Sequence, residues 1–452
     1  MALGGGTWQF QNKKLPGTYI NFISKVRAQT DIADRGYATM PLVLDWGPEG
    51  EVFTVTAEDF QKNSLKIFGY DYTADEIKGL RDLYKNLKTG YFYRVNNGAV
   101  KAASDIATAK YGGKRGNDIT VAVTVNVDEP AKFDVVTYIT IDGSKTAVDK
   151  QLAVAAWADV KDNDYVVFKR PAGAMAQTAG TPLTGGTNGA TVTGAQYQAY
   201  IDAIEPYYFN CLGYAGTDNK IKDLFVQFVK RMRDSVGAKF QVVIHGKEGV
   251  DYEGVISIKN DVTDEGASPA AAVYWLTGAE ASCLVNASCT NKIYDGEYTI
   301  KSQYSQSDLE KSITAGMLTF HNVSDPVSGD IKGQLRVLRD INTFTLFSKQ
   351  KNEDFAMNQV IRVLDQIAID VSRLFNKIYL GKEQNDDDGR VALWGDIVAL
   401  HKEYQRVRAI QNFKAEDVPV PTQGESKNSV LFSYQVQPTV CMEKLYVTCV
   451  VA

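Results

Sequence analysis

Apolar residues recur along the chain in two rhythms, one typical of helices and one typical of strands. Apolar positions three and four residues apart predict amphipathic helices, and alternating or continuous apolar runs between glycine and proline signals predict strands. The predicted helices cover residues 74–87, 146–160, 195–204, 219–236, 354–379 and 391–410. The predicted strands cover residues 38–44, 52–56, 91–96, 119–127, 133–141, 207–212, 240–244, 430–437 and 445–452. The alternation of helix and strand favours a largely parallel sheet with helices on its faces.

Changes in composition divide the chain into a core, an insertion and two arms. Glycine-rich loops bound a β-rich stretch that we interpret as an inserted domain, and a Pro-Gly signal starts an extended piece near the beginning. The predicted segments are an N-terminal arm (1–30), the first part of an α/β core (31–97), the β-rich insertion (98–189), the rest of the core (190–350), a C-terminal helical and β domain (351–437) and a C-terminal arm (438–452). The predicted fold class is therefore mixed α/β (α+β), multidomain, with a core built from both halves of the chain.

The last eight residues form an unusual ending. Leu445, Val447, Cys449 and Val451 share one face of the predicted strand, and Tyr446, Thr448 and Val450 share the other. Apolar groups on both faces indicate a strand that is covered on both sides. Such a strand pairs inside its own subunit or adds to a sheet edge of another molecule. Pattern alone favours pairing within the subunit, because sequential strands tend to be neighbours.

Charge and hydropathy exclude several classes of protein. The 452 residues suggest two to four domains, and 54 acidic against 49 basic residues give a net charge of −5. This balance argues against direct nucleic-acid binding and against a polybasic membrane anchor. No segment approaches the ~20 apolar residues that span a bilayer, and no secretory signal is evident, so we expect no membrane insertion and synthesis in the cytosol.

The candidate chemistry is sparse. The cysteines, which we interpret as buried thiols, are Cys211, Cys283, Cys289, Cys441 and Cys449. None lies at zinc-ligand spacing, and the glycines at 112–116 lack phosphate-loop spacing. The acidic loop 385–389 lacks the bidentate glutamate of a calcium loop, so an exposed acidic turn is favoured. We therefore predict no catalytic, cofactor or metal site.

One histidine supports an alternative. His245 follows a predicted strand, where α/β enzymes place catalytic groups, with Glu248 and Asp251 nearby. However, the chain has no G-x-S-x-G elbow for a nucleophile, so a structural role or none is favoured. An α/β hydrolase is the less favoured alternative function.

Six stretches, in this order, resemble the tail sheath proteins of contractile phage tails. They are the 15–22 arm (LPGTYINF), the two insertion borders at 109–117 (AKYGGKRGN) and 182–189 (PLTGGTNG), the stretch 339–344 (RDINTF), the helix ending at 379–382 (YLGK) and the final 442–447 (MEKLYV). The likeness spans nearly the whole chain and is nearest to the small sheath subunits of Gram-positive phages and phage-tail-like bacteriocins. It implies a structural protein without a cofactor, not an enzyme.

The resemblance also implies a mechanism. Sheath subunits stack as rings around an inner tube and donate terminal strands to their neighbours, which reverses the preference for pairing within the subunit. The implied donor residues are Thr18, Tyr19, Ile20, Asn21, Phe22, Leu445, Tyr446, Val447, Thr448, Cys449, Val450 and Val451. Contraction would then release conformational energy stored at assembly, with flexible joints at 25–34 and 438–442. A non-contractile tube or capsid protein is the second alternative.

The partners implied by the resemblance are further copies of the chain, the inner tube protein, and baseplate and tail terminator proteins. The candidates for contact with the tube are Lys402, Arg406 and Arg408, on the helix predicted at 391–410. The implied location is a virion tail or a bacteriocin particle assembled in the host cytoplasm. Whether the particle carries DNA stays open.

Overall fold

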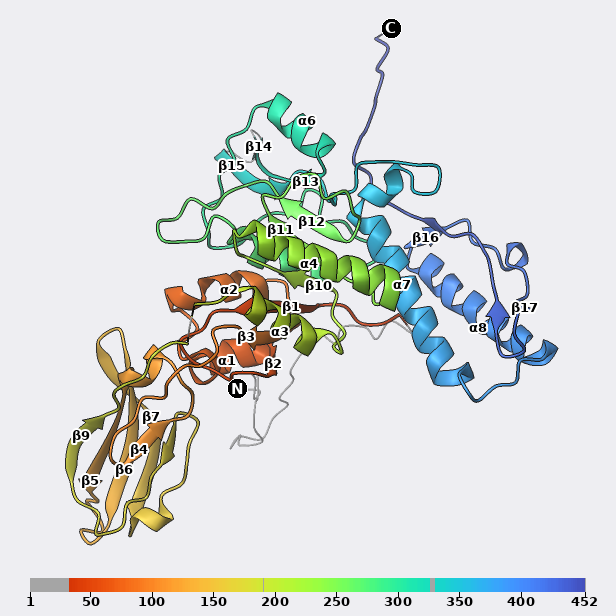
Figure 1. Ribbon diagram of the computed structural model, residues 1–452. Coiled ribbons are helices and arrows are strands. Elements are labelled where there is room, and N and C mark those ends of the chain that lie inside the picture. Colours follow the sequence, from red (N-terminus) through yellow and green to blue (C-terminus); the bar gives the residue numbers. More distant parts are fainter. Residues whose placement is uncertain (1–31, 190, 326–329, 452) are drawn as a thin grey trace, which may run out of the picture.

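A seven-stranded sheet lies at the centre of the computed structural model, which describes residues 32–189, 191–325 and 330–451 (Figure 1). The strand order is β13-β12-β11-β10-β1-β3-β2, parallel except for β2. The strands are β1 (Tyr37–Leu42), β2 (Val52–Thr56), β3 (Thr89–Arg94), β10 (Cys211–Gly213), β11 (Gln241–His245), β12 (Val255–Ile258) and β13 (Met317–Leu318). The strand order thus interleaves residues from both halves of the chain, and the mixed α/β class is confirmed.

Helices cover both faces of this sheet, as the apolar runs in its strands require. Successive residues of β11 and β12 point to opposite faces, so that Val243 and Ile256 pack on one core while Val242 and Val255 pack on the other. The first core is covered by α1 (Ala57–Phe68), α2 (Lys78–Tyr84) and α5 (Ala272–Ser282), and the second by α3 (Gly194–Ile204) and α4 (Asn219–Arg231). The short helix α6 (Gln306–Thr314) and the hairpin β14 (Phe320–Asp325) and β15 (Asp330–Val337) lie beyond β13.

The predicted helices of the core agree with the structure where caps and periodicity coincide. Asp218 caps α4 by accepting a hydrogen bond from the Lys220 amide, and Gly237 adopts φ 91° at the other end, after a π-helical turn. Three helices of the described chain were not predicted, namely α1, α5 and α6. α5 is almost wholly buried, so it shows no amphipathic stripe, and α1 directly follows β2 at its Thr56 cap.

The insertion forms a separate β structure that extends away from the sheet (Figure 1). Its main sheet has the order β7-β6-β5-β9, with a second pair β4-β8. The strands are β4 (Ala107–Ala109), β5 (Ile119–Val125), β6 (Phe133–Ile141), β7 (Ser144–Val154), β8 (Val166–Phe168) and β9 (Thr178–Pro182). The helix predicted at 146–160 is wrong, because residues 144–154 are strand β7. Asp142 and Gly143 adopt φ 48° and 75°, the conformation of a tight hairpin turn, and that turn pairs β7 with β6.

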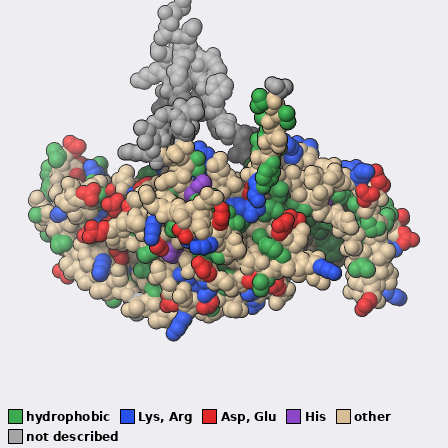
Figure 2. All heavy atoms as spheres, turned by 90° about the horizontal axis from the view of Figure 1, so that it is seen from above, with side chains coloured by type: hydrophobic (Ala, Val, Ile, Leu, Met, Phe, Trp, Pro, Cys, Tyr) green, Lys and Arg blue, Asp and Glu red, His purple; other side chains and the backbone are tan. Residues whose placement is uncertain are grey.

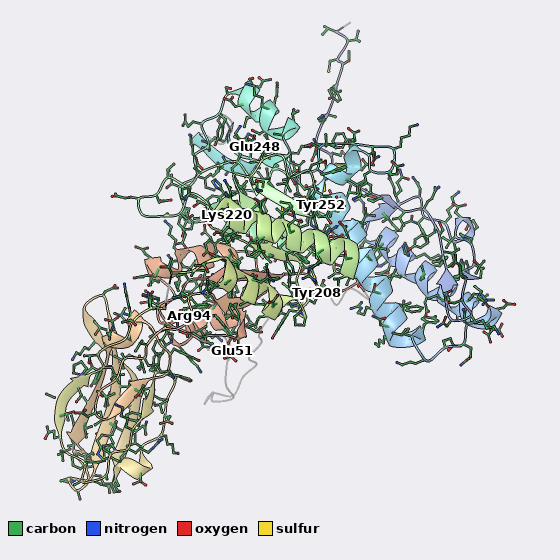
Figure 3. The ribbon with its side chains drawn as sticks, viewed as in Figure 1. Glu51, Arg94, Tyr208, Lys220, Glu248 and Tyr252 are labelled. Carbon is green, nitrogen blue, oxygen red and sulfur yellow. The ribbon has the colours of Figure 1, made fainter. Side chains whose placement is uncertain are left out.

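A buried arginine joins the insertion to the sheet. Arg94, at the end of β3, has no exposed side-chain surface and donates to the carbonyl oxygens of Gly47 and Gly112 at 3.2 and 2.8 Å (Figure 3). Gly189, at the second border, packs so closely that a Cβ there would lie 2.2 Å from the Asn97 carbonyl oxygen. Both borders are therefore packed tightly against the core.

Two long helices dominate the C-terminal part (Figure 1). They are α7 (Asn358–Leu374), extended by a π-helical turn at Phe375–Tyr379, and α8 (Asp387–Arg406). The short strands are β16 (Ile410–Gln411), which pairs with β19 (Gln437–Pro438), and β17 (Thr422–Gln423), which pairs with β18 (Val430–Leu431). The strand predicted at 430–437 therefore forms only at its two ends.

A buried charge cluster fixes α7 to the central part. Arg362 is 2% exposed, and its guanidinium lies 2.6 Å from Glu280 and 3.2 Å from Asp340. Burial raises the pKa of Glu280 well above its usual value. Burial alone would also raise the pKa of Asp340, but Arg362 and hydrogen bonds lower it. One turn along, Asp365 pairs with Arg233 of the turn after α4 at 2.5 Å. Removing one partner of such a pair costs about 3–5 kcal/mol, so α7 is held firmly.

Candidate inter-subunit surface

The end of the chain projects from the body as a bare apolar segment. Residues 444–451 join no strand within the part of the chain that the structure describes. The exposed fractions are 87% for Leu445 and Tyr446, 68% for Val447, 88% for Val450 and 94% for Val451. Figure 2 shows this segment standing clear of the surface with apolar side chains along it.

This conformation corrects two expectations. Pairing of the last strand inside its own subunit, which pattern alone favoured, is not what the structure shows. The apolar pattern of the predicted strand is present in the sequence, but no strand of the described body pairs with residues 445–451. The interpretation of all five cysteines as buried thiols is also wrong, because Cys441 and Cys449 are exposed and Cys283 is half-buried.

The root of this C-terminal segment is fastened to the body. The Cys441 amide donates to the side-chain oxygen of Gln359 at 3.0 Å, and the Gln359 amide group donates to the Thr439 carbonyl at 3.2 Å. Glu443 accepts from Arg339 at 2.7 Å and from the Thr290 hydroxyl at 3.0 Å. Most of the predicted joint 438–442 is therefore held down, and the free segment begins at Lys444.

The root of the N-terminal arm is fastened in the same way. The Ala33 amide donates to Asp370 at 3.0 Å, and Arg35 donates to the Cys283 carbonyl at 2.8 Å and to Gln366 at 3.4 Å. The predicted donor residues Thr18, Tyr19, Ile20, Asn21 and Phe22 lie outside the described residues.

One helix thus anchors both arm roots. Gln359 holds the C-terminal root, while Gln366 and Asp370 hold the N-terminal root. Positions separated by seven and eleven residues lie on the same side of an α-helix, and eleven residues span about 16 Å. The sequence analysis missed these residues. The available signal was a second, polar row on α7, at 359, 362, 366 and 370, beside the apolar stripe.

The three predicted tube-facing residues are exposed and lie close together in sequence at the end of α8. Lys402 and Arg406 are one turn apart on the helix, and Arg408 adopts φ 64° in the turn that follows. Arg406 pairs with Glu403, so its charge is partly neutralised within the helix. The structure places three cations at one end of α8, and their contact with a tube stays a prediction.

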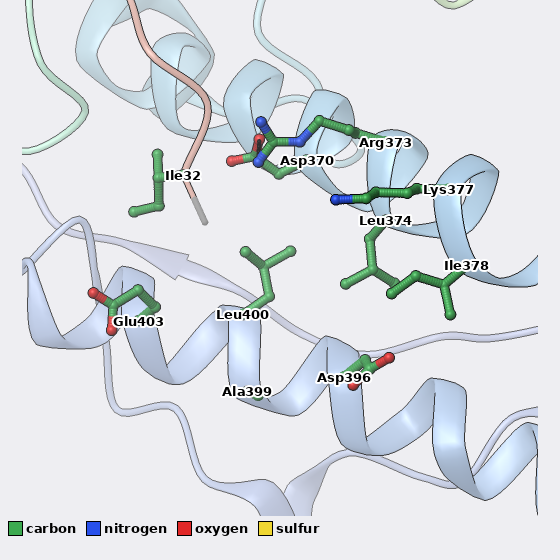
Figure 4. A pocket seen from close by; sticks show the side chains of 10 residues that line it. All are labelled: Ile32, Asp370, Arg373, Leu374, Lys377, Ile378, Asp396, Ala399, Leu400 and Glu403. Carbon is green, nitrogen blue, oxygen red and sulfur yellow. Dashed lines mark ion pairs between the residues drawn. The ribbon is translucent and has the colours of Figure 1, made fainter. Parts of the chain in front are cut away.

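A groove lies between α7 and α8 (Figure 4). Its volume is about 570 Å³, and the first described residue, Ile32, lines it together with residues of both helices. Leu374 and Ile378 approach from the α7 side, and Leu400 approaches from α8. One end of the groove therefore lies at the first described residue.

The surroundings of His245 do not support the alternative of a catalytic histidine. His245 ends β11, is buried, and its Nε2 lies 3.0 Å from an Asp261 oxygen. Burial lowers its pKa. The two acidic residues predicted to assist His245 have other surroundings. Asp251 accepts hydrogen bonds from the Thr345 and Leu346 amides, and Glu248 lies in a loop. Ser257, the nearby hydroxyl, accepts from the Lys247 amide.

The acidic groups have structural roles. In the acidic loop, Asp386 caps α8 by accepting from the Gly389 amide at 2.9 Å, so this helix starts four residues earlier than predicted. Among the described residues, one group has metal-ligand spacing, formed by Glu280, Cys289 and Asp340, with ligand atoms within 4.8 Å of one another. Arg362 pairs with both carboxylates, so a side chain already supplies the positive charge there.

No helix of the described chain is both long and apolar enough to cross a bilayer.

Comparisons with known proteins match this architecture along the chain. Phage tail sheath profiles match residues 35–95 (tail sheath protein Gp18 domain III, N-terminal region), 96–188 (β-sandwich domain), 190–343 (central domain) and 350–452 (C-terminal domain). A sheath tail protein from Desulfitobacterium hafniense is 36% identical with a TM-score of 0.78, and covers 95% of this chain and 99% of its own. The chain belongs to the phage tail sheath protein family. This family is one of structural proteins, so the interpretation of the chain as a non-enzyme is confirmed and the hydrolase alternative is rejected.

Two further relatives extend the comparison. The sheath tail protein Lin1278 of Listeria innocua is 30% identical with a TM-score of 0.75, over 91% of this chain and 93% of that one. The phage-like element PBSX protein XkdK of Bacillus subtilis is 28% identical over 98% of this chain and 99% of its own. The contracted helical sheath of the anti-feeding prophage, 11% identical with a TM-score of 0.53, shares the fold.

Proposed function

We propose that this sheath-family chain is the subunit of a contractile tail sheath that polymerises as stacked rings around an inner tube. The observation that carries the proposal is the bare apolar segment 445–451 on a body that buries its other apolar strands. An exposed strand of this kind is a template for pairing with another chain. A second copy of the chain supplies such an edge in every ring.

The donated strands are Leu445, Tyr446, Val447, Thr448, Cys449, Val450 and Val451 at one end and, by resemblance, Thr18, Tyr19, Ile20, Asn21 and Phe22 at the other. The β16–β19 ladder is the acceptor that we favour. It has two strands and therefore two open edges, and Ile410 of β16 is buried in the C-terminal core. Two-stranded ladders are marginal alone and gain stability from added strands.

Contraction follows from strands that persist while other contacts change. Each backbone hydrogen bond of a donated strand contributes about 1 kcal/mol net, so a strand of this length outlasts weaker contacts between bodies. The extended state is then a trapped arrangement, and contraction releases energy stored at assembly, as expected of a bistable interface. This movement drives the inner tube through the target envelope without a nucleotide.

Contacts with other proteins complete the proposal. Lys402, Arg406 and Arg408 form the exposed cationic end of α8 and are candidates for electrostatic contact with the tube protein. Baseplate and terminator proteins cap the two ends of the stack. The assembled form is part of a virion tail or a bacteriocin particle, built in the host cytoplasm.

The direct test is deletion of residues 445–452. The full chain is expected to form wide hollow cylinders in negative-stain images. The deletion variant is expected to stay a folded monomer, with an unchanged circular dichroism spectrum, because the segment makes no contact that the body needs. Normal cylinders from the deletion variant would contradict strand donation. Narrow tubes or closed shells from the full chain would favour the tube or capsid alternative.

A further inference from the structure

Two thiols of the central part lie together in the wall of one cavity. Cys283 directly follows α5, and Cys289 lies six residues further along the chain. Both line a cavity of about 420 Å³, and their side chains are within hydrogen-bonding reach of each other. Cys283 is half-buried, whereas Cys289 is only 1% exposed. The cavity therefore gives small molecules access to one sulfur atom that has a second sulfur atom beside it.

The surroundings of the two thiols make them chemically unequal. A hydrogen bond from the Cys289 thiol lowers the pKa of Cys283 to about 7, with help from the guanidinium groups of Arg362 and Arg35 and against the effect of burial. The same hydrogen bond, together with burial, raises the pKa of Cys289 well above its ordinary value. Burial also raises the pKa of Cys211. Cys283 is therefore the nucleophilic thiol of the central part, and Cys289 is placed to react after it.

We propose that Cys283 and Cys289 form a reversible disulfide, with a small-molecule disulfide as the oxidant. The Cys283 thiolate attacks one sulfur atom of the small disulfide, forms a mixed disulfide and expels one small thiolate. Cys289 then loses its proton to solvent and attacks the Cys283 sulfur, which expels the second small thiolate. The two protein thiols are oxidised to one disulfide, and the small disulfide is reduced to two thiols.

The local backbone can accommodate this bond. A disulfide holds its sulfur atoms about 2 Å apart, so rotation of the two side chains has to close only the remaining separation. Cys283 leaves α5 in extended backbone, with φ −64° and ψ 128°. Residues 284–289 belong to no helix or strand. A small adjustment of this loop therefore breaks no regular secondary structure.

The residues between the two cysteines join the central part to the C-terminal part. Val285 packs in an apolar core of the C-terminal part. The Asn286 side chain donates to the Val407 carbonyl oxygen at 2.9 Å, and Arg362 donates to the Ala287 carbonyl oxygen at 2.8 Å. A disulfide closes these residues into a small ring and removes open conformations of the segment. Oxidation is therefore expected to stiffen this contact.

Only the consequence for a particle rests on the proposed function. Thiols stay reduced in the cytoplasm, whereas disulfides persist outside cells. Subunits that assemble in the cytoplasm carry the two thiols, and subunits of a released particle carry the disulfide. The contact between the central and C-terminal parts is then stiffer after release than during assembly.

Mass spectrometry of the full chain tests the bond. The background carries Cys441→Ser and Cys449→Ser, since these two thiols are exposed. The folded protein is incubated with oxidised glutathione, quenched with acid, and alkylated with iodoacetamide in denaturant. Both cysteines lie on one tryptic peptide, residues 260–292. We expect this peptide in most molecules without alkyl groups and two hydrogens lighter than its reduced form, while Cys211 is alkylated. Dithiothreitol should restore both alkylation sites.

Single variants separate the two steps. Cys289→Ser is expected to stop at the mixed disulfide between Cys283 and glutathione. Cys283→Ser is expected to react with glutathione roughly tenfold more slowly or less, because its remaining thiol is buried and has a raised pKa. Circular dichroism checks that both variants fold, and the background protein tests the bond without either of them. In the oxidised background protein, hydrogen exchange at residues 284–288 should be slower than after dithiothreitol.

Three results would overturn the inference. These are full alkylation of the peptide 260–292 after incubation, disulfides only between chains or with Cys211, and equal reaction rates of the two serine variants. Exchange at residues 284–288 that does not change on oxidation would contradict the stiffening. Failure of the reduced protein to form cylinders would count against the proposed function alone, so the two proposals fail separately.

Discussion

Strand β11 and the C-terminal segment 445–451 are both rich in apolar residues but have opposite surroundings. All five residues of β11 are buried, with β10 on one edge and β12 on the other. The segment 445–451 is also apolar, yet its large apolar side chains are 68–94% exposed. The comparison shows that an apolar strand pattern specifies burial without specifying the molecule that provides it. In a sheath subunit, the missing partner is another subunit.

The largest expected effect comes from breaking the donated ladder while keeping the chain length. Successive amides of a strand point to opposite edges, so the double change Val447→Pro and Thr448→Pro removes one ladder donor whichever edge pairs. Polymerisation is expected to be lost, as measured by sedimentation velocity. The control is Val447→Ile with Thr448→Val, which keeps a strand-forming sequence and should assemble. Assembly of the proline variant at the normal level would contradict the account.

The second largest expected effect is a difference in how β11 and the segment 445–451 contribute to the free energy of unfolding of the monomer. Ile244 of β11 is fully buried, whereas Val450 is 88% exposed. Ile244→Ala is expected to lower the free energy of unfolding by about 2–5 kcal/mol through lost burial and a cavity. Val450→Ala is expected to change it by less than about 0.5 kcal/mol. Urea denaturation at concentrations where the chain is monomeric measures both values, and a cost above 1 kcal/mol for Val450→Ala would show that the arm packs on its own body.

A smaller effect is expected from pH through the C-terminal core. His401 is fully buried, stacks on Phe413 and meets Tyr434 edge to face, and its Nδ1 lies 2.8 Å from the Ile397 carbonyl oxygen. Burial lowers the pKa of His401 below 6.5. The unfolded chain then binds more protons than the folded chain below pH 6.5, so stability falls as pH falls. Unfolding of the chain at pH 7.5 and 5.5 measures this loss, which should shrink in His401→Gln. An unchanged loss in that variant would place the titration elsewhere.

The smallest effect concerns the root of the C-terminal arm. Glu443 and Arg339 are partly exposed, and pairs of this kind contribute about 0–1 kcal/mol. Glu443→Gln should therefore leave the free energy of unfolding within about 1 kcal/mol. Hydrogen exchange at residues 438–443 should become faster, because the clasp that holds the root is weakened. Exchange that stays unchanged would mean that Gln359 alone holds the root.

Most elements of the core were predictable because local sequence patterns determine them. The stripe and caps of α4 and the apolar strands β2, β6 and β11 follow from side-chain periodicity and backbone hydrogen bonding. The failures have specific causes. The helix predicted at 146–160 was wrong because the Asp142-Gly143 hairpin turn pairs the following residues with β6 as strand β7. Helix α5 was missed because its uniform burial leaves no amphipathic stripe in the sequence. The arm roots were missed because Gln359, Gln366 and Asp370 act through contacts with residues far away in sequence.

A high-resolution cryo-electron microscopy map of the assembled particle tests the central claim most directly. The account predicts that residues 445–451 of each copy run as a strand hydrogen-bonded to the C-terminal part of a neighbouring copy, in both the extended and the contracted state. A map in which these residues fold back onto their own subunit, or stay unpaired between subunits, would contradict it.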